Sequence, residues 1–363
     1  MSQEFIPAAK PIIGDEERAA VDAVMATGML AQGTQVAAFE SEFSQVLLDG
    51  RASVAVNSGT SGLHLGLLAS GVGVGDEVIV PSFTFAATGN SVAATGATPV
   101  FADIELDHYT LDVDHVASLI TDKTKGIMPV HLYGHPFAAE AFAKLAADHG
   151  IDLYEDAAQA HGASLNGKKV GTFGKFAMFS LYPTKNMTSG EGGMVSTADA
   201  DVERNLRLLR NQGMEKQYEN EIVGFNARMT DLHASIGRVQ LTKVLGWTAQ
   251  RQANAAFLTA NLEGVGTPVV APGAEHVFHQ YTIRVPEDRD GMSKALREEY
   301  NIGSGVYYPV PNHRLPSFNR TEELPNTEIA AKEVLSLPVH PSLSQDDLER
   351  IVSAVNKLAQ AGA

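Results

Sequence analysis

A lysine stands just beyond a short apolar segment in the middle of the chain. The segment covers residues 176–181, Pro183 ends it, and Lys185 follows in a turn rich in Gly, Ser and Thr that extends to residue 193. A lysine held beyond a buried strand is better placed than a surface lysine to lose its proton, and its neutral amine can attack a carbonyl carbon. Lys185 is therefore a candidate covalent nucleophile, although an ordinary surface loop would contain the same residue types.

A second group of polar residues, 57–62, separates an apolar strand from an apolar helix. Gly59 lets the backbone come close to a ligand, and Ser58 and Thr60 offer hydroxyl groups. A helix start exposes unpaired N–H groups and a partial positive charge. This arrangement suits a phosphate group, and the alternative is a capped helix that binds nothing.

Further candidates follow other apolar segments. Asp156 comes after residues 151–154, and a carboxylate at such a depth needs a cation or a hydrogen-bond donor. A protonated pyridine nitrogen would satisfy it, whereas the alternative is a helix cap. Phe85 could stack on a flat ring or simply pack in the core. Ser180 could donate to a phosphate, and we expect His161 to have a structural or supporting role.

The elements that must position these residues alternate between strand and helix. Helical patterns at 15–27, 63–68 and 138–149 are interspersed with short segments rich in Val and Ile, which are apolar on both faces as buried parallel strands are. These strands are expected at 52–56, 78–80, 98–101, 126–130 and 151–154. The alternation predicts an α/β fold with a mostly parallel sheet and helices on both faces. Ligands bind beyond the carboxyl ends of such strands, where the candidate residues lie.

The alternation stops at a long helical stretch, 230–262. Two β-like segments, 280–285 and 302–308, and a helix at 346–358 follow it. We therefore predict a large domain at 1–250, which includes an N-terminal arm, and a smaller α+β domain at 251–363. The Gly-Val-Gly-Val-Gly run at 71–75 follows a helix and precedes a strand, which is the wrong order for a dinucleotide-binding fingerprint.

Composition excludes several classes of function. The 363 residues include 27 Lys plus Arg and 43 Asp plus Glu, a net charge of −16 that repels nucleic acid and anionic membranes. The absence of cysteine rules out disulfides and thiolate zinc sites, and we expect no metal. The first residues lack a basic and apolar leader, and no stretch approaches the length of a membrane span. These features predict a cytoplasmic protein.

A phosphate anchor, a ring stacker, a pyridinium partner and an imine-forming lysine are together the parts of a pyridoxal 5′-phosphate (PLP) site. With these motifs in order, the chain resembles the sugar aminotransferases of the DegT/DnrJ/EryC1/StrS family. The resemblance covers nearly the whole chain and implies the aspartate aminotransferase fold (fold type I). It is carried by the motifs at 57–61, 81–85, 129–134, 155–159, 185–193, 224–231 and 308–313.

The resemblance implies a role for each matching position around the cofactor ring. Lys185 would hold PLP as an imine and would also act as general acid and base. Asp156 would pair with the pyridine nitrogen, Gln159 would contact the ring hydroxyl, and Phe85 would stack on the ring.

The resemblance also implies how the phosphate is bound. Gly59, Thr60 and Ser180 would bind it within one chain. Asn226 would reach it from the neighbouring subunit, so that the protein would be a homodimer with shared active sites.

The implied reaction moves an amino group from glutamate to a nucleotide-linked keto-sugar through a ping-pong cycle. Within the family, the run 185–193 is closer to members that aminate carbon 4, which favours a 4-keto-6-deoxy sugar. Tyr308 and His313 would border the sugar pocket, or they could be packing or surface residues.

Three other functions fit parts of the pattern. A PLP-dependent sugar dehydratase of the same fold would have His in place of Lys185. A PLP-binding sensor or scaffold without turnover is less favoured, because no basic DNA-binding segment is present. The family resemblance speaks against an amino-acid aminotransferase that never uses sugars, but the spacing of the residues alone does not.

Overall fold

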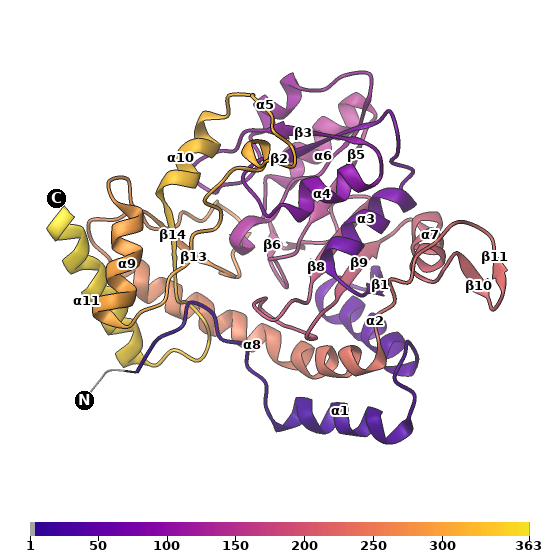
Figure 1. The fold of residues 1–363 in the computed structure, drawn as a ribbon, viewed down its shortest axis with the longest axis horizontal. Helices are drawn as coiled ribbons and strands as arrows, with labels where there is room; N and C mark the ends of the chain where they lie inside the picture. The colour runs from indigo at the N-terminus through magenta and orange to yellow at the C-terminus, as the bar shows by residue number, and fades with distance from the viewer. Residues whose placement is uncertain (1–3, 363) are drawn as a thin grey trace.

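A seven-stranded sheet forms the centre of the computed structural model, which describes residues 4–362 (Figure 1). Only β9 runs antiparallel to its neighbours, so the predicted α/β class with a mostly parallel sheet is confirmed. In spatial order the strands are β1 (Ala52–Val56), β9 (Gly193–Thr197), β8 (Phe176–Ser180), β5 (Asp152–Asp156), β4 (Thr124–Ile127), β2 (Glu77–Pro81) and β3 (Thr98–Ala102).

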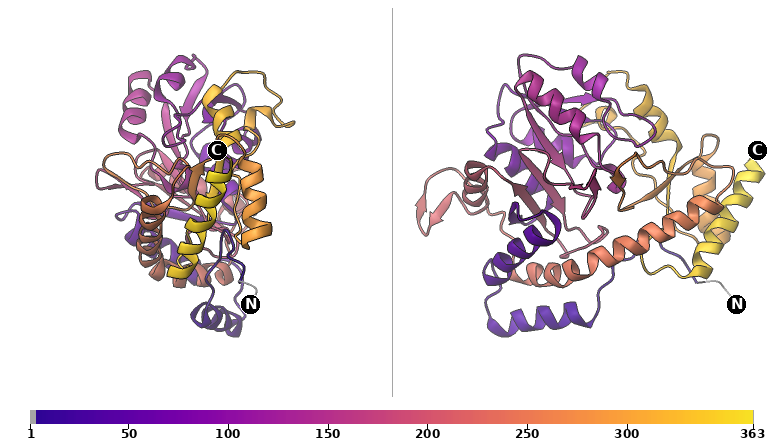
Figure 2. Two further views of the ribbon diagram at one scale, coloured as in Figure 1. Left: turned by 90° about the vertical axis from the view of Figure 1, so that its left-hand side faces the viewer. Right: turned by 180° about the vertical axis from the view of Figure 1, so that it is seen from behind.

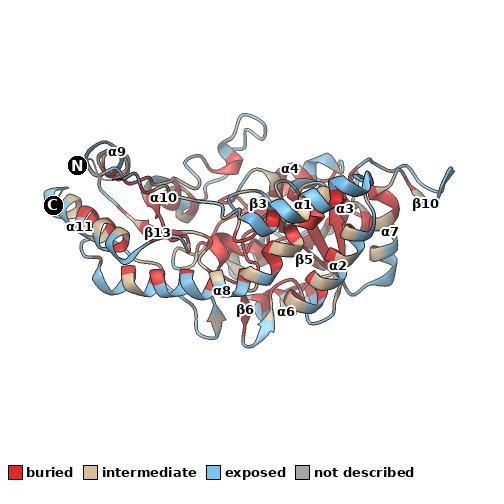
Figure 3. Cartoon of the chain, turned by 90° about the horizontal axis from the view of Figure 1, so that it is seen from below, coloured by how far each residue is buried: buried red, intermediate tan, exposed pale blue. Residues whose placement is uncertain are grey.

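Both faces of the sheet are buried, because alternate residues of one strand enter different cores (Figure 3). In β8, Phe176 and Met178 belong to the core on one face, and Ala177 and Phe179 belong to the core on the other. The first face is covered by α3 (Gly59–Ala69), α4 (Ala87–Ala94) and α7 (Ala200–Arg210). The second is covered by α2 (Thr34–Leu47), α5 (Val113–Ser118), α6 (Ala139–His149) and part of α8 (Asp231–Asn261).

Helix α8 runs from beneath the sheet into a smaller lobe at the other end of the molecule (Figures 1 and 2). The lobe has its own hydrophobic core, to which α8 contributes from Ala255 onward. The lobe contains β13 (Tyr281–Arg284), β14 (Val334–Leu337), α9 (Arg289–Tyr300) and α11 (Gln345–Gly362). Helix α10 (Pro325–Glu333) instead packs Ala330 and Ala331 against Phe83 and Ile104 of the large lobe. Because α8 is continuous through residue 250, the change of core falls inside a helix.

The N-terminal arm spans both lobes. Ile6 bridges to Ile302 and lies in the core of the small lobe, whereas α1 (Asp15–Thr27) packs on α8. The expected strand at 302–308 consists of isolated bridges at Ile302 and Gly305. The partner of β13 is instead β14, which pairs with it in antiparallel register.

Short elements complete the connections. A hairpin of β10 (Met214–Lys216) and β11 (Glu219–Asn220) projects from the large lobe (Figure 1). A small sheet joins β6 (Ser164–Leu165), β7 (Lys168–Lys169) and β12 (Ala274–Glu275). Turns of 3₁₀ helix occur at η1 (Leu132–Gly134) and η2 (Asn312–Arg314). Within residues 4–362, no helix combines the length and apolarity needed to cross a bilayer.

Candidate active site

A cavity of about 610 Å³ lies where the sheet meets the small lobe. Its volume falls within the range of roughly 300–1,000 Å³ that is usual for cofactor and ligand sites. The walls come from the turns after β1, β2, β5 and β8 and from the residues around Tyr308. Eight residues predicted from the sequence line it together: Gly59, Thr60, Phe85, Asp156, Gln159, Ser180, Lys185 and Tyr308.

Lys185 lies in a turn, where its N–H donates to the carbonyl oxygen of Tyr182 at 3.0 Å. Burial lowers the pKa of Lys185 from 10.5 to about 8, and the nearby negative charge of Asp156 opposes that shift. An appreciable fraction of the amine is therefore neutral near physiological pH, as a nucleophile or proton acceptor requires.

Asp156 ends β5 with only 4% of its surface exposed. The Thr88 hydroxyl donates to its Oδ2 at 2.8 Å, and the Ala158 N–H donates to its Oδ1 at 3.1 Å. Burial raises the pKa of Asp156, whereas these two donors and the positive charge of Lys185 lower it. A cation placed against this carboxylate would be strongly favoured.

The phosphate-type end of the cavity is built on the start of α3. Ser58 caps the helix by accepting from the Ser61 N–H at 3.1 Å. The N–H groups of Gly59 and Thr60 stand in the first turn, where no carbonyl of the helix can pair with them. A Cβ atom at Gly59 would lie 3.0 Å from the Ser180 Cβ, so a larger residue here would push against Ser180.

The ring-facing side chains are held in fixed orientations. The Gln159 Oε1 accepts from the Tyr133 N–H at 2.6 Å, and its Nε2 donates to the Tyr308 hydroxyl at 3.2 Å. Phe85 keeps 58% of its surface exposed while it lines the cavity, and its ring centroid is 5.9 Å from that of Tyr308. An apolar ring face is therefore available for stacking.

Three residues considered in the sequence lie elsewhere. His313 is fully buried outside the cavity lining, and its Nδ1 lies 2.6 Å from the Ser82 Oγ. Asn226 is exposed and does not line the cavity of its own chain. His161 packs against the rings of Phe43 and Phe179, which also contact each other.

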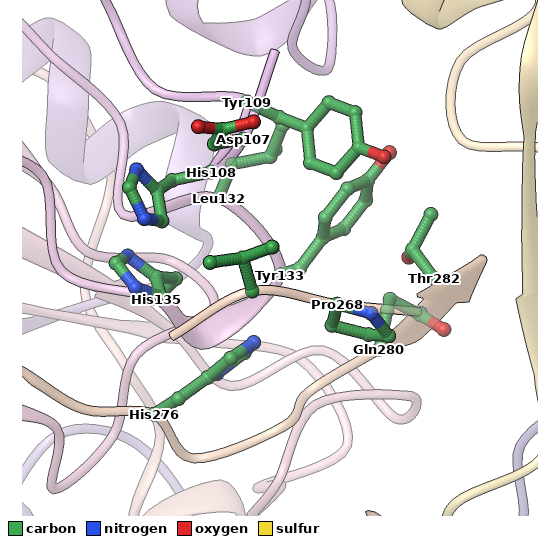
Figure 4. Close-up of a pocket in the computed structure, with 11 residues that line it drawn as sticks. Asp107, His108, Tyr109, Leu132, Tyr133, His135, Pro268, His276, Gln280 and Thr282 are labelled. Atoms are coloured by element: carbon green, nitrogen blue, oxygen red, sulfur yellow. The ribbon is translucent and has the colours of Figure 1, made fainter. Parts of the chain in front are cut away.

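A smaller pocket braces the segment that orients Gln159. Figure 4 shows three histidine rings in a column, His108, His135 and His276, beside Tyr133. The rings of His108 and His135 stack with centroids 4.7 Å apart. Burial and the neighbouring His108 lower the pKa of His135 to about 4, so its ring is neutral. The His135 Nε2 accepts from the Ala271 N–H at 3.0 Å, and Tyr133 lines the same pocket.

Thr88 is one of the site residues that sequence reasoning missed, as are His279 and Tyr307 of the cavity lining. It lies on α4, only three residues beyond Phe85, and is 1% exposed. Its hydroxyl donates to Asp156. Helix α4 begins directly after the β2 turn, so the two residues are distant in the sequence. The sequence signal that could have identified Thr88 was a polar residue on the buried face of this short helix.

The cavity, the buried carboxylate, the lysine and the glycine-lined cradle all fit PLP, and together with the fold they define a PLP-dependent transferase. The model of the DegT/DnrJ/EryC1/StrS aminotransferase family matches residues 11–356, and the chain belongs to this family. It is a sugar aminotransferase.

Three known proteins illustrate the similarity. The dTDP-3-amino-3,4,6-trideoxy-alpha-D-glucose transaminase of Streptomyces venezuelae is 40% identical over 353 residues, which cover 95% of this chain and 92% of that protein. The structure of S. venezuelae DesV in complex with a ketimine intermediate has a TM-score of 0.91, 40% identity and 95% coverage of both chains. The structure of NtdA of Bacillus subtilis with bound cofactor PMP, the aminated form of PLP, has a TM-score of 0.92 and 27% identity, and the match covers 99% of this chain and 86% of NtdA.

Proposed function

We propose that the protein transfers an amino group from glutamate to the keto group of a nucleotide-linked sugar, with PLP as cofactor. The observation that carries the proposal is that Lys185 and Asp156 line one cavity together with a glycine-lined helix start. The membership of the sugar aminotransferase family supports it. The identities of the amino donor and of the sugar are part of the proposal.

Each end of the cofactor has residues to hold it. The N–H groups of Gly59 and Thr60 and the Ser180 hydroxyl would bind the phosphate. Asp156 would pair with the ring nitrogen, and Phe85 would cover one face of the ring. Bound in this way, PLP supplies an electron sink for the bond that breaks at the donor's α-carbon.

Lys185 would do the proton transfer. Its Nζ, whose pKa burial lowers to about 8, would accept the proton that the donor's α-carbon loses and would hold it for return. Because one cofactor would store the amino group between the two half-reactions, the first product would leave before the keto-sugar enters. Ping-pong kinetics are the consequence.

We propose that two copies of the chain share their active sites. Exposed apolar side chains on the β10–β11 hairpin and on its return segment support an interface there, among them Tyr218, Val223 and Phe225. Asn226 follows this segment and would complete the phosphate site of the partner. Mixing inactive Lys185→Ala with an inactive Asn226 variant should restore activity through hybrid dimers. No recovery after proven subunit exchange would contradict the shared site.

The acceptor sugar has two positional candidates. The run 185–193 favours a keto group at carbon 4, whereas the name of the S. venezuelae relative places its amine at carbon 3. The Tyr308 hydroxyl, which lies at the cavity wall beside Gln159, is the proposed contact to the sugar.

The test is a half-reaction. The PMP-loaded protein is mixed with UDP-, dTDP- and GDP-linked sugars that carry a keto group at carbon 3 or carbon 4, and the return of the PLP absorbance is followed. We expect rapid return with one class of keto-sugar. If the PLP absorbance returns with 2-oxo acids but with none of these keto-sugars, sugar transamination is contradicted.

A further inference from the structure

A second, narrow pocket shares Lys185 with the cofactor cavity. The N-terminal arm contributes Lys10, the turn that holds Lys185 forms one wall, and helix α8 contributes Trp247 and Arg251. The proposed reaction assigns no role to these three side chains. The pocket volume of about 10 Å³ corresponds to roughly one water molecule, so it admits at most the oxygen end of a small polar group.

Arg251 is buried in this pocket without a counter-ion. Only 7% of its surface is exposed, its Nη1 donates to the Phe278 carbonyl oxygen at 3.2 Å, and its Nε has no hydrogen-bond partner. Among residues 4–362, no Asp or Glu forms an ion pair with it. Burial therefore lowers the pKa of Arg251 to about 10 with nothing to oppose the shift. A buried and unpaired guanidinium is costly unless an anion joins it.

Other positive groups surround the same place. Besides burial, Lys185 and Arg251 both lower the pKa of His279. Burial, Arg251 and Lys10 lower the pKa of His340, whereas a hydrogen bond to Pro7 and the charge of Asp347 raise it. This concentration of positive charge occurs in a chain whose net charge is −16. Lys10, Lys185 and Arg251 line the pocket, and among the described residues no Asp or Glu does, so the local field favours a small anion there.

We propose that this pocket binds a carboxylate group of the amino donor, with Arg251 as its principal partner and Lys10 at its rim. The inference rests on the proposed transamination and names the recognition site for its first substrate. A guanidinium can donate two parallel hydrogen bonds to a carboxylate, and the free donors of Arg251 are suited to this.

The position of the pocket favours the donor over the sugar nucleotide. Lys185 must reach the carbon that loses its proton, and in an amino acid a carboxylate is bonded directly to that carbon. In a nucleotide-linked sugar, the diphosphate is separated from the keto carbon by the sugar ring. A pocket that Lys185 itself lines is therefore placed for a carboxylate.

The single tryptophan of the chain provides a direct binding signal. Trp247 lines the pocket, and no other tryptophan contributes to the fluorescence. The PLP-loaded protein is titrated with glutarate, which has two carboxylates and no amine and so cannot react. We expect saturable quenching in the wild type. Arg251→Gln should weaken glutarate binding by about 10-fold or more, the effect of losing a charge-assisted hydrogen bond.

Two further variants serve as controls. Arg251→Lys keeps the charge but loses the paired donors, so an intermediate affinity for glutarate is expected. If Arg251→Gln does not fold, the affinity of Arg251→Lys tests the proposal in its place. Arg238→Gln alters another arginine of α8, which pairs with Glu42 and does not line the pocket. It should bind glutarate as the wild type does.

A donor half-reaction then locates the carboxylate. Loss of the PLP absorbance is measured with L-glutamate, L-alanine and γ-aminobutyrate. If Arg251 binds the α-carboxylate, Arg251→Lys raises the KM for glutamate and alanine alike. If it binds the distal carboxylate, the KM for alanine is unchanged and those for the other two rise. The first result supports the placement of the pocket beside Lys185, whereas the second would keep Arg251 as a partner of the donor but contradict the argument from its position.

Two results would overturn the proposal. One is glutarate binding by the Arg251 variants with wild-type affinity. The other is an equal loss in the keto-sugar half-reaction, which would show that Arg251 holds the fold and not the donor. Neither measurement with glutarate or amino donors uses a sugar, so a failure of the sugar assignment leaves this test intact.

Discussion

Replacing Asp156 by Asn should remove most turnover while the protein stays folded and retains PLP. The two side chains are nearly equal in size, and Asn can still accept from the Thr88 hydroxyl that now contacts the Asp156 Oδ2 at 2.8 Å. What is lost is the negative charge, which is buried at the end of β5 where water cannot replace it. The ring nitrogen of PLP then has no anion to keep it protonated.

The size of the effect follows from the burial of the carboxylate. Two unit charges about 3 Å apart attract each other by about 5 kcal/mol at an effective dielectric constant of about 20. That energy corresponds to a shift of about 4 units in the pKa of the ring nitrogen. Even if only part of this energy acts on the rate-limiting step, a fall in kcat on the order of 10³-fold is expected.

The assay compares kcat and PLP content across a graded series. Thr88→Val removes one of the two donors to Asp156 and should reduce kcat by about 10-fold. Asp152→Asn lies on the same strand and alters a partly exposed ion pair with Lys175, so it should leave kcat within about twofold. If Asp156→Asn retains near-normal turnover with PLP bound, the proposed role of the carboxylate is wrong.

Two further predictions concern cofactor binding and acid stability. Gly59→Ala places a Cβ 3.0 Å from the Ser180 Cβ, so it should weaken PLP binding at least about 10-fold in an absorbance titration without unfolding the protein; unchanged affinity would contradict the cradle. Burial of Glu17 opposes its ionisation, but hydrogen bonds led by that from Lys243 lower its pKa from 4.5 to about 2. Because the folded-state pKa is depressed, this stabilisation is complete above about pH 4.5 and is lost as the pH falls toward 2. Relative to Glu17→Gln, the wild type should lose about 1–2 kcal/mol of unfolding free energy over that range, measured by denaturant titration, and parallel pH profiles would argue against it.

The sequence allowed the cavity lining to be predicted because the relevant residues follow strands directly. Once the strands are recognised, the shared direction of parallel strands predicts that Gly59, Asp156 and Lys185 lie together beyond the carboxyl ends of the sheet. Short runs of Val, Ile and other apolar residues made those strands recognisable. The run at 71–75 likewise connects α3 to β2, as its order predicted.

What could not be predicted depends on packing between distant segments. Thr88 reaches Asp156 across the sheet, and no local pattern marks that contact. His313 stands in a polar motif near Tyr308, yet the turn of η2 directs it to the Ser82 hydroxyl. In the sequence, Arg251 resembles a surface residue of a long helix. In the structure it is buried and donates to the Phe278 carbonyl oxygen. In each case the sequence shows the polar side chain but does not indicate which distant residue it contacts.

The central claim is that Lys185 carries the cofactor within reach of Asp156. Treating the yellow PLP-loaded protein with borohydride and digesting it should give one peptide with the mass of reduced PLP added at Lys185, with loss of the near-visible absorbance. Lys185→Ala should show neither the absorbance nor the label. Labelling of a different lysine, or an unlabelled Lys185 after the absorbance is lost, would contradict the account.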